Sequence, residues 1–159
     1  QRLPADGVVR ASTWARLTRA VQVPTYTGIP ESCRVGANVI CVSKPQRKAF
    51  IYRNGKLVKS MAIRVGGFTD DKYGRYRVHN TVSGTYRVYR KHVNPYSQRY
   101  GAGAMPYSTM FNPNMYVHAD AGFMQVGYAG SSHGCVNMST TDAKWVYKNM
   151  PIGTKVVVF

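Results

Sequence analysis

A two-residue turn signal in the first half of the chain places the strongest constraint on the fold. Asn54-Gly55 separates two strand-like runs, residues 48–53 and 56–65. Asn and Gly both tolerate the positive φ angles of a tight hairpin turn, so the pattern predicts an antiparallel hairpin. Similar strand patterns predict further strands at residues 85–89, 114–118 and 155–159.

One helix is expected in the C-terminal third. Residues 141–149 place Ala143 and Val146 on one face, with Thr140 or Thr141 as the N-terminal cap. Fifteen Gly and twelve Tyr, together with few strong helix formers, favour β structure elsewhere. The expected fold is therefore mainly β, a compact β-sandwich or half-open barrel with one short helix near the C-terminus.

The N-terminal part differs from the rest. In residues 1–32 apolar side chains recur at spacings of three and four around Trp14, and a Pro/Gly linker follows. The stretch 6–17 resembles the end of a small helical peptidoglycan-binding module, although an amphipathic helix packed on the main domain explains it equally well. We expect a helical segment and linker over 1–32 and one domain over 33–159. We also expect no membrane span and no remaining secretion leader.

The net charge is strongly positive and unevenly distributed. Twenty-two Lys and Arg against six Asp and Glu give a formal charge of +16. Residues 33–100 hold 15 basic and 2 acidic side chains, whereas residues 101–159 hold 3 and 2. A cationic surface suits a polyanion, either a bacterial wall with its carboxylates and phosphodiesters or a nucleic acid. The net charge alone does not distinguish a wall-binding protein from a nucleic-acid-binding one.

Two of the three cysteines form a candidate pair. Cys33 and Cys41 lie eight positions apart, around a Gly36-Ala37-Asn38 turn that can bring them face to face. In an exported protein they would form a disulfide, and closing so short a loop is worth roughly 2.5 kcal/mol on the chain-entropy model. In a reducing cytosol they would be two small buried hydrophobic residues.

The third cysteine, Cys135, lies in a loop before the predicted helix. Gly134 permits a sharp turn that points neighbouring amides at one spot, an arrangement that stabilises an oxyanion. The N-terminal dipole of the helix that follows would favour a thiolate. His118 ends a predicted strand seventeen residues earlier, so a returning loop can place its imidazole beside the sulfur. Cys135 and His118 are therefore a candidate nucleophile and base.

The sequence resembles the signature of the L,D-transpeptidase catalytic domain at two places: His118 and, after a spacer, the loop Ser132-His133-Gly134-Cys135-Val136-Asn137. This is a family of cysteine enzymes of peptidoglycan cross-linking. The likeness spans about residues 39–159 and includes these further segments: the hairpin at 48–65, the strand start at 81–86, the Met-Pro-Tyr segment at 105–107, the helix at 142–145 and the closing strand at 151–156. Three positions depart from the common pattern: Val82 replaces Pro, Ala119 stands where many members have Gly, and Asn137 stands where others have Arg.

The resemblance implies roles for individual residues. Cys135 is the nucleophile, His118 is the base, and the carbonyl of Ala119 orients the imidazole in place of a carboxylate. The backbone amides of His133, Gly134 and Cys135 form the oxyanion hole. The implied substrate contacts are Met105 and Tyr107, in a flap over residues 100–111, together with Ser132 and Asn137. No cofactor and no metal are expected.

The implied reaction is a two-step acyl transfer. The cysteine attacks the carbonyl before the terminal D-Ala of a tetrapeptide stem, and an amine of a neighbouring stem then takes the acyl group, giving a 3→3 cross-link. Water as the acceptor would make the protein an L,D-carboxypeptidase, and this alternative stays open. The expected partners are peptidoglycan stem peptides and anionic cell-wall polymers rather than nucleic acid. The expected setting is extracytoplasmic (cell wall, periplasm or secreted), with a role in wall biogenesis and cell shape.

Three other functions compete with this interpretation. A zinc hydrolase would use His118, Asp120, His133 and Cys135, but the sequence has no helical His pair and no paired-cysteine knuckle. A nucleic-acid-binding module would use the basic and aromatic residues that interleave over 73–100. Strand alternation, with Tyr on one face and Arg on the solvated face, explains that pattern equally well. A non-catalytic wall-binding protein would tolerate the loss of Cys135.

Overall fold

The computed structural model describes residues 28–71, 73–113, 115–127 and 130–159. The helix expected around Trp14 and the module-like stretch 6–17 lie outside the described residues. Within the described part of the chain, no helix is long and apolar enough to cross a membrane.

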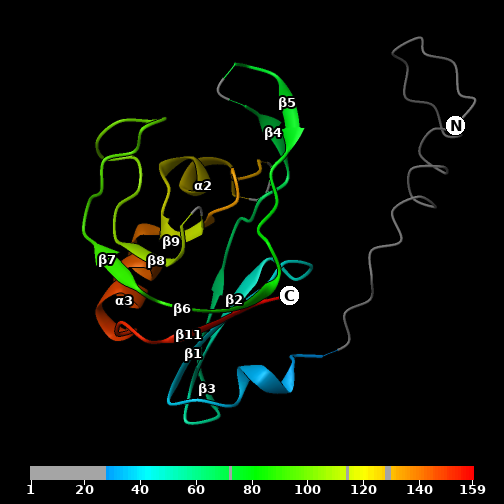
Figure 1. Cartoon of the computed structure of the whole chain (residues 1–159), viewed down its shortest axis with the longest axis vertical. Coiled ribbons are helices and arrows are strands. Elements are labelled where there is room, and N and C mark those ends of the chain that lie inside the picture. Colours follow the sequence, from blue (N-terminus) through cyan, green and yellow to red (C-terminus); the bar gives the residue numbers. More distant parts are fainter. Residues whose placement is uncertain (1–27, 72, 114, 128–129) are drawn as a thin grey trace, which may run out of the picture.

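Eleven strands, two α-helices and one 3₁₀ turn make up the described chain (Figure 1). In chain order they are η1 (Glu31–Cys33), β1 (Asn38–Ser43), β2 (Lys48–Arg53), β3 (Lys56–Ala62), β4 (Phe68–Asp70), β5 (Tyr76–Val78), β6 (Gly84–Arg87), β7 (Arg90–His92), β8 (Ser108–Asn112), β9 (Met115–Ala119), α2 (Ala121–Val126), β10 (Val136–Met138), α3 (Thr140–Asn149) and β11 (Lys155–Val158). The fold is mainly β, as the sequence predicts.

The strands form two larger sheets and a separate hairpin. One sheet has the order β3-β2-β1-β11-β6, the second has the order β10-β9-β8-β7, and β4 pairs with β5. A single cluster of buried side chains joins both sheets to α3. It includes Ile40, Val42, Ile51 and Ile63 from the first sheet, Phe111, Val117 and Val136 from the second, and Ala143, Val146 and Met150 from α3 and its end.

The predicted hairpin is confirmed. β2 and β3 pair antiparallel around Asn54 and Gly55, whose φ angles are 48° and 77°. Both residues occupy the left-handed region, which Asn and Gly enter at low cost. The second strand ends at Ala62, three residues before the predicted end.

The helices differ in two ways from the expectation. α3 begins at Thr140, and its cap is Ser139 instead of Thr140 or Thr141, because the Ser139 hydroxyl accepts the N–H of Asp142 and donates to the Asp142 carboxylate. The second difference is α2, which the sequence analysis did not predict. Its cap is Asp120, whose carboxylate accepts the N–H of Phe123 at 2.7 Å.

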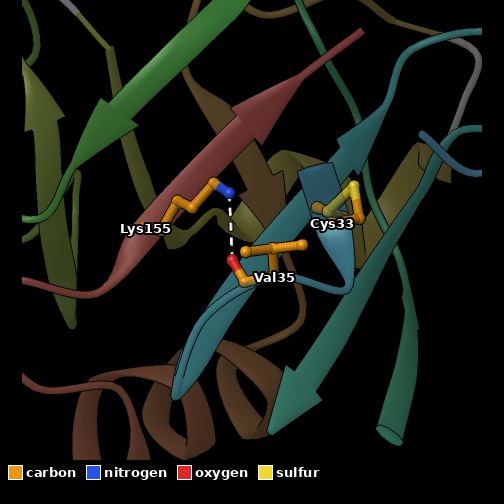
Figure 2. The surroundings of a disulfide bond; sticks show 4 residues. Cys33, Val35 and Lys155 are labelled. Atoms are coloured by element: carbon orange, nitrogen blue, oxygen red, sulfur yellow. Dashed lines mark hydrogen bonds between the residues drawn. A yellow bond between two sulfur atoms is a disulfide. The ribbon is translucent and has the colours of Figure 1, made fainter. Parts of the chain in front are cut away.

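The predicted disulfide joins Cys33 to Cys41, and their Cα atoms are 5.8 Å apart (Figure 2). Cys33 lies in the 3₁₀ turn η1, not in a strand facing β1 across a hairpin. The bond therefore fastens η1 to β1. Beside it, the ammonium of Lys155 donates a hydrogen bond of 3.0 Å to the carbonyl of Val35, so β11 also contacts this segment (Figure 2).

The tyrosines of residues 73–100 do not share a buried face. Tyr73, Tyr76, Tyr89 and Tyr100 are between 48% and 68% exposed. Tyr86 alone among the five interleaved tyrosines packs on the core, with its ring centroid 5.5 Å from that of Phe111. Strand alternation, the alternative explanation of this pattern, therefore does not hold for most of the segment, because much of it lies in loops and in three-residue strands such as β5 and β7.

Candidate functional site

Two neighbouring strands bring the candidate nucleophile and base together. β9 and β10 pair in parallel, with His118 opposite Asn137. Cys135 directly precedes β10, and Cys135 and His118 both line one cavity of about 420 Å³. The loop between these strands therefore returns as the sequence analysis expected.

The imidazole of His118 is held at both nitrogens. It is buried, Nδ1 lies 2.7 Å from the carbonyl oxygen of Ala119, and Nε2 lies 3.0 Å from the side-chain nitrogen of Asn137. A carbonyl only accepts, so Nδ1 donates to Ala119 and Nε2 accepts from Asn137. Burial lowers the pKa of His118, while the hydrogen bond to Ala119 opposes that shift. The ring is therefore a neutral base whose lone pair is on Nε2.

Arg64 fixes the orientation of the Asn137 amide. The Arg64 guanidinium donates from Nε to Asn137 Oδ1 at 3.2 Å, and the two backbones exchange hydrogen bonds of 2.9 and 2.8 Å. Because a guanidinium only donates, the amide oxygen faces Arg64 and the amide nitrogen faces His118. Arg64 also pairs with the Asp120 carboxylate, so its charge is compensated inside the protein.

Sequence reasoning missed Arg64. The contact with Asn137 joins residues 73 positions apart, and no spacing pattern marks it. Asn137 itself, expected to contact substrate, lines the cavity but engages both ends of its amide within the protein.

Cys135 has a free and weakly acidic thiol. The residue is partly exposed, yet burial of the thiol raises its pKa to about 11. A hydrogen bond with the backbone of Tyr116 lowers this pKa, and the Asp120 charge raises it. The expectation that the following helix favours a thiolate is not supported, because β10 lies between Cys135 and α3. A pKa of about 11 favours the neutral thiol near pH 7, so a nucleophilic role for Cys135 would need a base to accept its proton.

The loop that carries Cys135 is shaped by two hydroxyl groups. Gly134 has a φ of 111°, in the region that favours glycine. The Ser132 hydroxyl accepts the Gly134 N–H at 3.1 Å and donates to the Cys135 carbonyl, and the Thr81 hydroxyl donates to the Gly134 carbonyl at 2.9 Å. The Gly134 amide is therefore occupied, which leaves the amides of His133 and Cys135 as the candidate oxyanion donors.

His133 links the flap to the hairpin of β4 and β5. Its Nε2 lies 2.6 Å from the backbone oxygen of Asp70, and its Nδ1 lies 2.8 Å from the hydroxyl of Tyr100. The carbonyl requires a donor, so Nε2 carries the proton and Nδ1 accepts from Tyr100. Burial lowers the pKa of His133. Sequence reasoning considered its backbone amide and missed this bridging role of the side chain.

The flap contributes one of its two expected contacts. Met105 lines the cavity together with Tyr100, Gly103 and Ala104. Tyr107 is not among the lining residues, and its ring centroid lies 6.0 Å from that of Tyr147 on α3. The four side chains of the zinc alternative, His118, Asp120, His133 and Cys135, do not gather into a metal-binding cluster in the described chain.

Comparisons with known proteins agree on one family. The family model of the L,D-transpeptidase catalytic domain (YkuD) matches residues 37–158. YciB of Bacillus subtilis (strain 168), whose name assigns it provisionally to the L,D-transpeptidases, is 57% identical over 28 residues. That alignment covers 18% of this chain and 14% of the relative, so this chain matches only a small part of YciB.

Solved structures show the same fold. An L,D-transpeptidase from Xylanimonas cellulosilytica superposes with a TM-score of 0.68 at 26% identity, over 99% of this chain and 74% of its own. An L,D-transpeptidase from Stackebrandtia nassauensis superposes with a TM-score of 0.67 at 22% identity, over 99% of this chain and 71% of its own. The second likeness, at lower identity, supports the fold alone.

Proposed function

We propose that this chain, which belongs to the L,D-transpeptidase catalytic-domain family, is a cysteine acyltransferase that acts on peptidoglycan stem peptides. One observation carries the proposal. A free thiol and a neutral imidazole with its lone pair on Nε2 line the same cavity, and the ring is oriented by a backbone carbonyl. Nucleophilic catalysis by a weakly acidic thiol needs such a base.

In the acylation step the Cys135 sulfur attacks the carbonyl that precedes the terminal D-Ala of a tetrapeptide stem. The thiol proton goes to Nε2 of His118, because Nδ1 already donates to Ala119. In the resting structure Nε2 accepts from Asn137, so the base exchanges this hydrogen bond for the thiol proton. The proton then passes to the nitrogen of the leaving D-Ala, and a thioester remains on Cys135.

Charge develops on the attacked carbonyl oxygen. The amides of His133 and Cys135 are the donors that the loop leaves available, since Gly134 donates to Ser132. Donors fixed before reaction stabilise an oxyanion without reorganisation. The Ser132 and Thr81 hydroxyl groups hold the loop in this shape, which makes them positioning residues rather than catalytic ones.

In the second step an amine of a neighbouring stem attacks the thioester and forms the 3→3 cross-link. The C–S bond breaks, and the amine gives a proton to Nε2 of His118, which returns it to the departing Cys135 sulfur. Well-oriented groups reach effective molarities of about 10⁵ M or more, so a bound amine can outcompete water. Hydrolysis at the same thioester would give the L,D-carboxypeptidase activity. We place the reaction outside the cytoplasm, which agrees with a wall substrate and with the Cys33–Cys41 disulfide.

Incubation with a defined disaccharide-tetrapeptide, followed by mass spectrometry, tests the proposal. We expect release of D-Ala, a cross-linked dimer, and loss of both in Cys135→Ala. The Met124→Ala variant is the matched control, because Met124 is an exposed side chain outside the cavity. Free acid without dimer would assign the carboxypeptidase activity. Full D-Ala release by Cys135→Ala would refute the assignment of Cys135 as the nucleophile. No D-Ala release by the wild type would refute the acyltransferase and favour a non-catalytic wall-binding protein.

A further inference from the structure

A groove separate from the cavity of Cys135 lies at one end of the five-stranded sheet. It consists of two adjoining hollows of about 710 and 510 Å³, which share Ala37, Asn38 and Pro151 as lining residues. The groove and the cavity have no lining residue in common. In Figure 1 α2, which contributes to the cavity, lies in the upper half, whereas β6 and β11 lie in the lower half.

Five cationic side chains line this groove, which we call the basic groove. They are Arg53, Arg87, Lys91, Lys148 and Lys155. They come from the ends of β2 and β6, from β7, from the last turn of α3 and from the start of β11. Among the described residues, no Asp or Glu lines the two hollows. The topology thus gathers cations from both the strongly basic and the nearly neutral part of the sequence.

Three of the five cations are positioned by hydrogen bonds to neutral groups. Arg53 donates from Nε to the Asn38 side-chain oxygen at 3.2 Å, and Arg87 donates from Nη1 to the Gly153 carbonyl at 3.0 Å. The Lys155 ammonium donates to the Val35 carbonyl (Figure 2). Such hydrogen bonds orient a side chain without cancelling its charge.

The acidic residues that form ion pairs lie elsewhere. Asp142 pairs with Lys59, Asp120 with Arg64, Asp71 with Arg75 and Arg77, and Asp70 with Arg99. Among the described residues, none of the five groove cations shares an ion pair with a carboxylate. Like charges on one surface repel one another, so an anion that enters this groove would be bound favourably.

We propose that the basic groove binds a linear phosphodiester polymer that carries no bases. Guanidinium groups at Arg53 and Arg87 match a phosphate with paired donors, and the lysines add point charges along the groove. Single-stranded nucleic acid would need exposed aromatic faces for stacking. Within the described part of the chain, Tyr86 is the only aromatic residue that lines the groove. Its ring packs on Phe111, and its hydroxyl donates to the Val82 carbonyl at 3.1 Å. The proposal does not depend on the acyl transfer at Cys135.

Binding of poly(glycerol phosphate) to the full chain at several salt concentrations tests the proposal. In the double variant Arg87→Glu/Lys148→Glu we expect affinity to fall at least tenfold. The slope of log K against log salt should also become shallower by about 1 to 2, because fewer phosphates are neutralised. The control is Lys48→Glu/Lys144→Glu, which changes the net charge equally at exposed positions outside the groove and should lose less than threefold.

Two further readouts complete the test. Release of D-Ala from a soluble stem peptide should be equal in both double variants and in wild type, which separates this proposal from the acyltransferase. The milder Arg87→Gln/Lys148→Gln variant replaces the double reversal if that protein does not fold. Equal loss of affinity in the groove and control variants would overturn the proposal, since net charge would then explain binding. Tighter, groove-dependent binding of a thymidine oligonucleotide would replace it with a nucleic-acid site.

Discussion

In the cavity around Cys135 the one Lys or Arg side chain, Arg64, is buried and paired with Asp120, whereas the five cations of the basic groove share no ion pair in the described chain. A buried charge acts strongly on its neighbours, because low local polarity strengthens electrostatic interactions and shifts the pKa values of nearby groups. Exposed charges in the groove act together and are screened by salt. Basic side chains therefore differ between the two regions: Arg64 is buried and orients the Asn137 amide, whereas the groove cations are available to an anion.

Loss of the His118 base in the cavity should have the greatest effect on activity. His118→Ala should lower the rate of Cys135 acylation by about 10³-fold or more, because the thiol proton loses its acceptor while the backbone donors remain. His92→Ala is the control, since His92 is exposed and outside the cavity. The measurement is the single-turnover rate of D-Ala release. An unchanged rate in His118→Ala would show that another group takes the proton.

Removal of the buried Arg64 charge should cause the second-greatest loss of activity, and the same change at an exposed arginine should cause little. Arg64→Met frees the Asn137 amide to rotate, so Nε2 of His118 is no longer held as an acceptor. We expect kcat/KM to fall roughly 10- to 100-fold, less than the loss of about 10⁴ seen when a catalytic imidazole is held in the wrong tautomer. Arg77→Met is the control, because Arg77 is exposed and pairs with Asp71 on the surface.

The pH profile separates positioning from simple loss of structure. The Arg64 charge lowers the pKa of His118, and the Asp120 charge raises it. A base works when it is unprotonated, so activity falls as the pH drops through this pKa. Removal of the Arg64 charge raises the pKa and should move the acid limb of kcat/KM to higher pH, and Asp120→Asn should move it to lower pH. Unmoved limbs in both variants would assign Arg64 and Asp120 purely structural roles.

The parts of this site that could be predicted are those encoded by neighbouring residues. Asn54-Gly55 specifies a hairpin by its own φ preferences, and the Cys135 loop with its upstream His118 carries a local pattern. Arg64 and Asn137 meet across 73 residues, and His133 meets Asp70 across 63, so only the folded chain reveals them.

Two further misses have different causes, one local and one set by the whole fold. The helix α2 has six residues including a glycine, so its intrinsic signal is weak, and its start depends on Asp120, which also pairs with Arg64. The raised pKa of the Cys135 thiol reflects burial, which no sequence pattern measures. The basic groove shares this limitation, because β2, β6, α3 and β11 supply it from distant positions.

Loss of the disulfide should have a smaller effect, mainly on binding at the basic groove. Cys33 fastens the segment that leads to Val35 and Gly36, two lining residues of the basic groove. Cys33→Ser/Cys41→Ser should lower the free energy of unfolding by roughly 2.5 kcal/mol and weaken poly(glycerol phosphate) binding more than D-Ala release. Thiol counting in the unfolded, unreduced wild type should give one thiol. A count of three thiols would show that Cys33 and Cys41 are not bonded. Equal losses of poly(glycerol phosphate) binding and of D-Ala release would show that the disulfide supports the whole domain.

The smallest expected effect concerns salt and tests whether the two regions are independent. Binding to whole sacculi should fall steeply as salt rises, because exposed charges are screened beyond about 8–10 Å at physiological ionic strength. Turnover of a soluble stem peptide should change less than about twofold over the same range, because Arg64 is buried and paired with Asp120. The measurement follows binding and D-Ala release in the same salt series. If turnover falls as steeply as binding, exposed cations contribute to the substrate site and the two regions act as one surface.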